Sequence, residues 1–562
     1  MPSITLVDEQ PLASMGDPET LSGFVQWAAQ TCPAKKYALV LWDHGGGSRT
    51  GLFVDELFDK DILYLSELGQ ALNDGGVHLE LVAFDACLMC SLETARTIAP
   101  YANYMVASEE VTASSGSAYS EWLLEVYRNP GCDGAEVGVE FCDATQRKYV
   151  ERGAALEEAQ LTYSVIDLSR IGAVSEAFDR MFDFAGLLYE QAPARFSMFN
   201  TFLSESEKYG LGSADMIDLG SFLYSESSLS LVDPDCRNAL ASALEDAVYY
   251  TVKGSARSAS KGLSFCFAPD MSPDEMDAFA LNCRSASYLA LLDAVNADWE
   301  AADCVYEKAR RLTPIEDLDT YRIEWEITEL DGLPALRFTR LGASLLDCMF
   351  NLYQLDGNKI SLLGTIDTLR AWDEEDNTCF VMEPLDTWPA IEGTICSVDL
   401  VDTSNSQFLY NVPIQMVNRT NLRISSVRSY DDESGQWVDQ FEALGLWEGY
   451  DEDTRMPSRT ITSLYRVSGQ EFRLLYPCYS LDGEPDGKYT SSNPLTMYRA
   501  MEIDEVPLPV GTYYCNFTVR DIFGHHAHTA LIGLTWDGQT FSVVSPQDGD
   551  ASALPRGRDH LN

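Results

Sequence analysis

Two short apolar runs, separated by a single helical segment, constrain the fold of this chain more than any other feature. Tyr37–Trp42 and Leu79–Phe84 are rich in Leu, Val and Ala, and each run stops at an aspartate. Apolar residues recur at helical spacing between them, over Ile62–Leu72. A strand–helix–strand succession predicts two parallel strands joined by a right-handed crossover.

Polar residues of a particular kind follow both runs. His44 and three consecutive glycines, Gly45–Gly47, come after the first run, and Cys87 comes shortly after the second. Ligand sites in parallel sheets lie beyond the carboxyl ends of the strands, and neighbouring strands are about 4.8 Å apart. We therefore expect His44 and Cys87 to face one cleft, although 43 positions separate them.

This pair of side chains is suited to nucleophilic catalysis by a thiol. The thiolate is the attacking species, and a neighbouring imidazole accepts the thiol proton. The reaction also needs donors for the oxyanion that forms on the attacked carbonyl, and the backbone N–H groups of Gly45 and Cys87 are placed to supply them. Glycine after the histidine lets the main chain approach a substrate closely.

Other interpretations of the same residues stay open. Gly45–Gly47 is compatible with a phosphate loop, although no Gly-Lys-Ser/Thr follows and GxGxxG spacing is absent. Cys87 and Cys90 form a CxxC pair, which suits redox chemistry or metal binding, but the next cysteine is Cys132. A separate metal site is conceivable at a histidine tract near the end of the chain, made of His525, His526 and His528.

The pattern of apolar residues divides the chain into an α/β part and a β part. Residues 1–303 alternate strand-like runs with amphipathic helices, which predicts a mostly parallel sheet. From about residue 315, short alternating runs separated by turns such as Asp356–Gly357 predict β-sandwich-like material. The polar loop Tyr430–Gly435 suggests two β-rich domains, spanning residues 315–430 and 436–562.

Composition excludes some partners. The formal net charge is −50, from 88 acidic and 38 basic residues, so nucleic acid is not expected to bind. The same charge attracts basic polypeptides, although solubility alone also explains it. No apolar run is long enough to span a membrane, and Met1–Glu9 lacks the pattern of a secretory signal. The 14 cysteines are widely spread, as expected of buried free thiols.

The two strand-end motifs together resemble the paired signature of clostripain-type cysteine peptidases, relatives of caspases, gingipains and legumain. The signature lies in Ala38–Gly47 and Phe84–Met89. Asp17–Leu21, Ala107–Glu110 and Gly262–Phe265 also resemble family segments and occur in the family's order. The resemblance covers residues from about 10 to 300 and implies a caspase-like three-layer α/β/α sandwich for the domain at 1–303.

The resemblance also implies roles for individual residues. His44 matches the catalytic histidine, Cys87 the nucleophile, and the N–H groups of Gly45 and Cys87 the oxyanion donors. Asp85 matches an acidic residue near the pocket that receives Arg or Lys before the cut bond, where a carboxylate suits a guanidinium. Polypeptides with basic residues are then the substrates. A turn or helix cap is the alternative for Asp85.

Asn103–Ala107 is a third expected strand, and the two glutamates that follow it, Glu109 and Glu110, are further candidates for the same pocket. Their alternative is a solvated strand end. Family members often cut themselves after a basic residue, which makes Lys60 a candidate self-cleavage site and Arg49 a second one. An exposed surface lysine is the plain alternative for Lys60.

The resemblance implies no required cofactor, although calcium is used by clostripain itself. The acidic residues near Lys60 are candidate oxygen ligands without EF-hand spacing, namely Asp55, Glu56, Asp59 and Asp61. A secreted or cell-surface location is also implied. The usual family domain starts earlier relative to Asp17–Leu21, so either the given start is late or the sheet lacks its first strand and helix. A catalytically idle homologue that binds or adheres through its β-rich region is the alternative function; the presence of both His44 and Cys87 argues against it.

Overall fold

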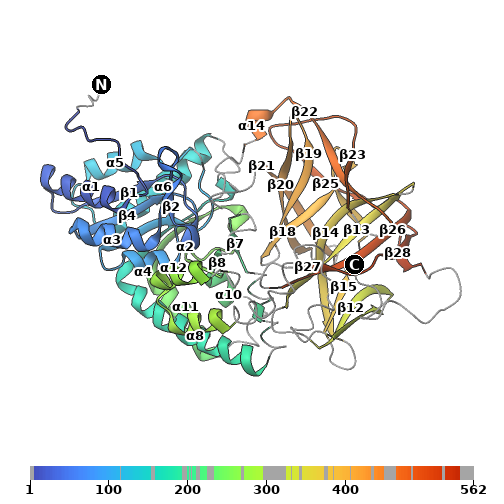
Figure 1. Ribbon diagram of the computed structural model, residues 1–562. Helices are drawn as coiled ribbons and strands as arrows, with labels where there is room; N and C mark the ends of the chain where they lie inside the picture. Colours follow the sequence, from blue (N-terminus) through green and yellow to red (C-terminus); the bar gives the residue numbers. More distant parts are fainter. Residues whose placement is uncertain are drawn as a thin grey trace.

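The computed structural model describes residues 6–294 and 324–544, apart from short gaps within each range. The expected boundary between residues 303 and 315 lies outside the described residues. An α/β half and a β-rich half lie side by side in Figure 1, the first coloured blue to green and the second yellow to red.

Five strands form the main sheet of the first half, in the order β1-β4-β5-β6-β9. They are β1 (Ala38–Trp42), β4 (Leu79–Asp85), β5 (Ala102–Ser108), β6 (Thr162–Asp167) and β9 (Val248–Lys253). The predicted parallel arrangement is confirmed for β1, β4 and β5, whereas β6 and β9 run antiparallel to their neighbours. Helices join β5 to β6, and the chain re-enters the sheet at the end where β5 leaves it.

Helices cover both faces of this sheet, because side chains of a strand alternate between its faces. Leu81 and Ala83 of β4 join the core formed with α5 and α6, while Val82 and Phe84 join the larger core on the other face. The predicted α/β class is confirmed for this half. The longer helices are α1 (Pro18–Thr31), α3 (Leu65–Gly75), α4 (Leu92–Ile98), α5 (Tyr119–Arg128), α6 (Gly134–Arg152), α8 (Ile171–Gln191), α10 (Leu219–Tyr224), α11 (Pro234–Ala247) and α12 (Pro273–Cys283).

A hairpin not foreseen from the sequence lies between β1 and α3. Its strands β2 (Leu52–Asp55) and β3 (Asp61–Leu63) pair antiparallel, so α3 begins at Leu65 rather than Ile62. Other short elements are α2 (Gly47–Thr50), η1 (Glu56–Phe58), η2 (Leu168–Arg170) and η4 (Ser255–Arg257), and a small sheet of β7 (Lys208–Tyr209), β8 (Met216–Asp218) and β10 (Ser264–Cys266).

The second half is built of strands, as predicted. Gly357 (φ 63°) lies in the expected turn between β13 and β14, and Gly538 (φ 96°) lies in the turn between β28 and β29. The elements are β11 (Glu324–Leu330), β12 (Leu333–Arg340), β13 (Leu345–Asp356), β14 (Lys359–Trp372), β15 (Thr378–Met382), β16 (Thr387–Ile391), β17 (Thr394–Ile395), β18 (Val398–Ser404), β19 (Gln407–Gln415), β20 (Arg419–Asp431), β21 (Gln436–Trp447), α14 (Leu464–Val467), β22 (Glu471–Tyr479), β23 (Pro485–Ser491), β24 (Leu495–Thr496), β25 (Ile503–Pro507), β26 (Gly511–Asp521), β27 (His526–His528), β28 (Ile532–Trp536) and β29 (Phe541–Val543).

Strands from residues 315–430 and 436–562 share sheets. β13 pairs with β26, β16 pairs with β25, and β20 pairs with β21 across the polar loop that was expected to separate two domains. The described residues of this half therefore do not separate into two sheets at that loop.

A small apolar cluster contains residues of both halves. It joins Ala159 and Ala256 of the α/β half to Leu409 of β19 and to Leu444 and Trp447 of β21. All five side chains are buried, and Trp447 is only 5% exposed. Ala256 belongs to η4 and directly precedes Arg257.

Candidate active site

The register of β1 and β4 places the two strand-end motifs next to each other. The two strands are adjacent and parallel, as predicted, and Trp42 pairs with Asp85 at their carboxyl ends. His44 and Cys87 each lie two residues beyond that pair. A Cβ built on Gly45 would lie only 2.2 Å from the carbonyl oxygen of Cys87, so the histidine loop touches the backbone of the cysteine.

The hairpin of β2 and β3 holds the histidine loop in place. The His44 carbonyl accepts a hydrogen bond from the Phe53 N–H at 2.9 Å, and the Gly46 N–H donates to Gly51 at 2.9 Å. These two bonds form a bridge between Gly45 and Leu52 that does not use the N–H of Gly45. This N–H therefore stays compatible with its expected role as an oxyanion donor.

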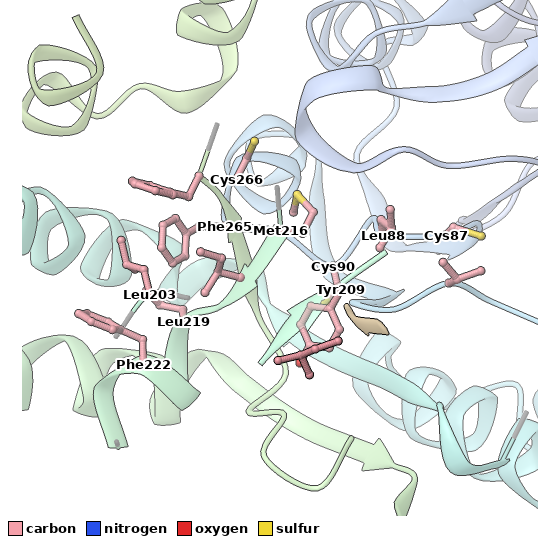
Figure 2. Close-up of a cluster of buried hydrophobic side chains, with 14 of the residues drawn as sticks. Cys87, Leu88, Cys90, Leu203, Tyr209, Met216, Leu219, Phe222, Phe265 and Cys266 are labelled. Atoms are coloured by element: carbon pink, nitrogen blue, oxygen red, sulfur yellow. The ribbon is translucent and has the colours of Figure 1, made fainter. Parts of the chain in front are cut away.

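Cys87 begins a tight turn after β4. The turn is fixed by Leu88, whose φ is 64°, and by hydrogen bonds from Leu88 N–H to Glu110 O (3.3 Å) and from Cys90 N–H to Ser108 O (3.0 Å). Cys87 is fully buried. Figure 2 shows it at one end of the apolar cluster, with its sulfur directed away from Met216.

Thr112 contacts the sulfur of Cys87 twice. Its backbone N–H donates to the sulfur at 3.3 Å, and its hydroxyl lies 3.5 Å from the same atom. The sequence offers no motif that singles out this threonine, which lies 25 positions beyond the cysteine. Only the pairing of the segments after β4 and β5 brings the two residues together.

Cys90, the second cysteine of the CxxC pair, is a packed thiol. Its sulfur donates to the Gly262 carbonyl at 3.2 Å, and burial, followed by the charge of Glu109, raises its pKa well above the ordinary value. A raised pKa opposes thiolate formation and so opposes reactivity. Both cysteines of the pair are free thiols, and no disulfide joins them.

The carboxylate of Asp85 lies against the segment at residues 116–117. Its carboxylate, only 1% exposed, accepts hydrogen bonds from the Ser117 N–H (3.0 Å) and from the Tyr119 hydroxyl (3.0 Å), with the Tyr163 hydroxyl at 3.5 Å. The alternative of a helix cap is wrong, because α4 is capped by Ser91.

Glu109 is completely buried, which contradicts the solvated strand end considered for it. Its carboxylate accepts hydrogen bonds from the Ser260 hydroxyl (2.6 Å), the Gly262 N–H (3.1 Å) and the Tyr209 hydroxyl (3.2 Å). Burial, together with the neighbouring Asp218, raises the pKa of Glu109 well above its ordinary value, and burial also raises the pKa of Asp218.

Glu110 is equally buried and forms an ion pair with Arg257. Its other carboxylate oxygen accepts the N–H groups of Val111 (2.6 Å) and Gly210 (3.1 Å). Glu109 and Glu110 thus contact segments around residues 207–218 and 257–262, whereas Asp85 contacts Ser117, Tyr119 and Tyr163. The structure does not bring the two glutamates to the partners of Asp85.

Comparison with known proteins adds to this geometry. The family model described as the clostripain family matches residues 4–278. Residues 4–278 therefore belong to the clostripain family. Clostripain of Hathewaya histolytica is 34% identical over 127 residues, which cover 19% of this chain and 24% of that protein. The chain thus matches about a quarter of the length of this curated relative.

Solved structures of other cysteine proteases are also similar. A secreted C11 cysteine protease from Bacteroides thetaiotaomicron, solved with an irreversible peptide inhibitor, is 17% identical with a TM-score of 0.38, over 49% of this chain and 77% of that chain. An inactive zymogen C11 protease from Parabacteroides distasonis is 18% identical with a TM-score of 0.37, over 50% and 78%.

The two candidate self-cleavage residues lie in the β2–β3 hairpin and just before it. Lys60 is at the tip of the β2–β3 hairpin, half-buried, with φ 60° directly after Asp59 at φ 54°. Its N–H donates to Asp55 O at 3.0 Å. Arg49 lies in α2 and forms an ion pair with Glu275 at 3.2 Å.

Metal ligands do not gather in the described part of the chain, where no three His, Cys, Asp or Glu side chains are arranged to hold an ion. Asp55 and Asp61 instead accept hydrogen bonds from Met15 N–H (3.0 Å) and the Ser14 hydroxyl (2.5 Å). His525 lies outside the described residues, and His528 bonds to Thr518 at 2.8 Å. Among the described helices, none has the length and apolarity needed to cross a bilayer.

Proposed function

We propose that this chain is a cysteine endopeptidase that cleaves peptide bonds after Arg or Lys. The observation that carries the proposal is the β1–β4 register. Trp42 pairs with Asp85 at the ends of the two adjacent strands, and His44 and Cys87 each follow that pair by two residues. The contact of Gly45 with the Cys87 backbone supports it, as does membership of the clostripain family.

The reaction follows from the roles of these groups. His44 takes the proton of Cys87, and the thiolate attacks the carbonyl carbon of the peptide. The N–H groups of Gly45 and Cys87 stabilise the oxyanion. His44 then gives its proton to the leaving amine, which leaves an acyl-enzyme at Cys87. Water, activated by His44, hydrolyses this thioester and restores the thiol.

Asp85 accounts for the preference for basic residues in this proposal. Its buried carboxylate supplies a negative charge two residues before the nucleophile. A guanidinium or ammonium group close to it would form a charge-assisted hydrogen bond in a site shielded from water. Neutral side chains gain nothing from the same carboxylate, so the charge discriminates between substrates.

The test is hydrolysis of fluorogenic peptide amides that differ only in having Arg, Lys or Ala before the cut bond. We expect cleavage after Arg and Lys, none by Cys87→Ala, and a tenfold or greater loss of the Arg-over-Ala preference in Asp85→Asn. Circular dichroism verifies that both variants are folded. Undiminished cleavage by Cys87→Ala would refute the assignment of the nucleophile.

The complete burial of Cys87 favours a second candidate, a closed and catalytically idle homologue that acts as a binding protein through its β-rich half. A thiol-directed arginyl peptide probe separates the two. The peptidase reacts with the probe at Cys87, whereas the idle homologue leaves this thiol unlabelled.

A further inference from the structure

Thr112 places both its backbone N–H and its hydroxyl against a single sulfur atom. The N–H lies 3.3 Å and the hydroxyl 3.5 Å from the Cys87 sulfur, both within the range of hydrogen bonds to sulfur. Thr112 is only 5% exposed, so water does not compete effectively for these donors. A thiolate would accept from both of them, whereas a neutral thiol uses its own proton in one of the contacts.

The segment that carries Thr112 is fixed on the side of Glu110. The Glu110 N–H donates to the Thr162 hydroxyl at 2.8 Å, and the Glu110 carbonyl accepts the Leu88 N–H at 3.3 Å. The Glu110 side chain holds the N–H of Val111 at 2.6 Å, directly before Thr112. These bonds tie the Thr112 segment to the same turn that carries Cys87.

Arg257 fixes Glu110 in turn. Its guanidinium pairs with Glu110 and also donates to Glu207 (2.9 Å) and to the Lys208 carbonyl (3.1 Å), and it lies 5.5 Å from the ring of Tyr209. Arg257 and both of its carboxylate partners are at least 95% buried. A buried pair of this kind is costly to break and therefore holds its geometry.

We propose that Thr112 is a catalytic residue that stabilises the thiolate of Cys87, and that the Glu110–Arg257 ion pair is the device that positions it. The proposal rests on Cys87 being the nucleophile. When the S–H bond breaks, the proton moves to the imidazole of His44, and Thr112 keeps both of its own protons. The two donors then face a full negative charge, and charge-assisted hydrogen bonds are stronger than neutral ones.

The test is the pH dependence of iodoacetamide alkylation at Cys87, followed by mass spectrometry of the peptide that contains it. Thr112→Val removes the hydroxyl but keeps the shape and the backbone N–H. We expect its alkylation rate at pH 6 to fall about tenfold and its pH midpoint to rise. Thr112→Ser keeps the hydroxyl and is expected to stay within about twofold of the wild type.

Glu110→Gln tests the positioning pair. We expect it to raise the alkylation midpoint in the same direction as Thr112→Val, and the double variant to shift by less than the sum of the two single variants, because both changes act on the contacts between Thr112 and the sulfur. A purely structural role would lower the melting temperature of Glu110→Gln and leave the alkylation midpoint where it is, which would overturn this part of the proposal.

Alkylation needs no substrate, so this test is independent of peptide hydrolysis. A midpoint unchanged in Thr112→Val, with peptide hydrolysis by the wild type intact, would overturn the role of Thr112 alone. A shifted midpoint without any hydrolysis would support Thr112 and count against the peptidase. A wild-type alkylation midpoint no lower than that of a cysteine in a short unstructured peptide would overturn the stabilised thiolate.

Discussion

Gly45 sets how closely the His44 loop approaches Cys87. A methyl group at this position would lie 2.2 Å from the Cys87 carbonyl oxygen and 2.9 Å from its nitrogen, which no side chain can accept without moving the backbone. Gly45→Ala is therefore expected to reduce kcat by a hundredfold or more, since one oxyanion donor is displaced. Peptide hydrolysis under saturating substrate measures the effect.

Gly23→Ala is the matched control, because a Cβ on Gly23 of α1 meets nothing within 4 Å. Its kcat is expected to equal that of the wild type. Equal kcat for Gly45→Ala and the wild type would contradict the close contact between the two strand-end loops.

The buried carboxyls of Glu109 and Asp218 predict a pH dependence of stability. Burial raises both pKa values, so the folded protein holds protons that the unfolded chain has lost. Stability therefore falls as the pH rises from the ordinary value of Glu109, near 4.5, through its raised value. In Glu109→Gln one carboxyl no longer titrates, and the fall should be smaller.

Urea denaturation at a series of pH values from 4.5 upward measures this difference. The amide of Gln mimics the protonated carboxyl and keeps the fold. Denaturation midpoints that decline equally with pH in the wild type and in Glu109→Gln would show that this carboxyl does not titrate as described.

The β2–β3 hairpin is the element that sequence reasoning missed. The acidic segment Asp55–Asp61 looks like an ordinary loop, because β2 and β3 have only four and three residues and leave no measurable alternation. The neighbouring elements were predictable from local signals: Asp17 and Pro18 mark the start of α1, and the apolar runs mark β1 and β4.

Self-cleavage after Lys60 is a prediction for this hairpin. Peptidases bind extended chains, but Asp59 and Lys60 have φ of 54° and 60°, so cleavage requires the hairpin to open first. Lys60→Ala should remain one chain on a denaturing gel while the wild type is cut, and Lys60→Arg should be cut as well. Cutting of Lys60→Ala at the wild-type position would exclude Lys60 as the site.

The strand-end chemistry was predictable because it depends on local sequence and on one rule of parallel sheets. The burial of Glu109 and Glu110 was not predicted, because their partners come from residues 207–262, about 100 to 150 positions later. Contacts at such separations depend on the completed fold. Thr112 escaped notice for the same reason.

At the scale of the whole molecule, the two halves meet around Trp447 and Ala256. The sequence identifies the β-rich half by its alternating runs, but the pairing of β13 with β26 joins strands about 165 positions apart, which no local pattern reveals. The apolar cluster between the halves is equally long-range. Because Ala256 precedes Arg257, this contact lies one residue from the ion pair that positions Thr112.

Trp447→Ala is expected to lower the free energy of unfolding by roughly 3–5 kcal/mol, because it removes a large side chain from this buried cluster. Chemical denaturation followed by circular dichroism measures the change. Val417→Ala, at a position 90% exposed, is the control and should change stability by less than about 0.5 kcal/mol. A loss of stability in Trp447→Ala as small as the one expected for the control would show that the cluster contributes nothing.

The central claim is that His44 and Cys87 form one reactive pair. Its most direct test is covalent labelling by an arginyl peptide chloromethyl ketone, with the modified residue located by peptide mass spectrometry. We expect a single adduct on Cys87 in the wild type and labelling at least a hundredfold slower in His44→Ala. An adduct on another cysteine, or equally fast labelling of Cys87 without His44, would contradict the account.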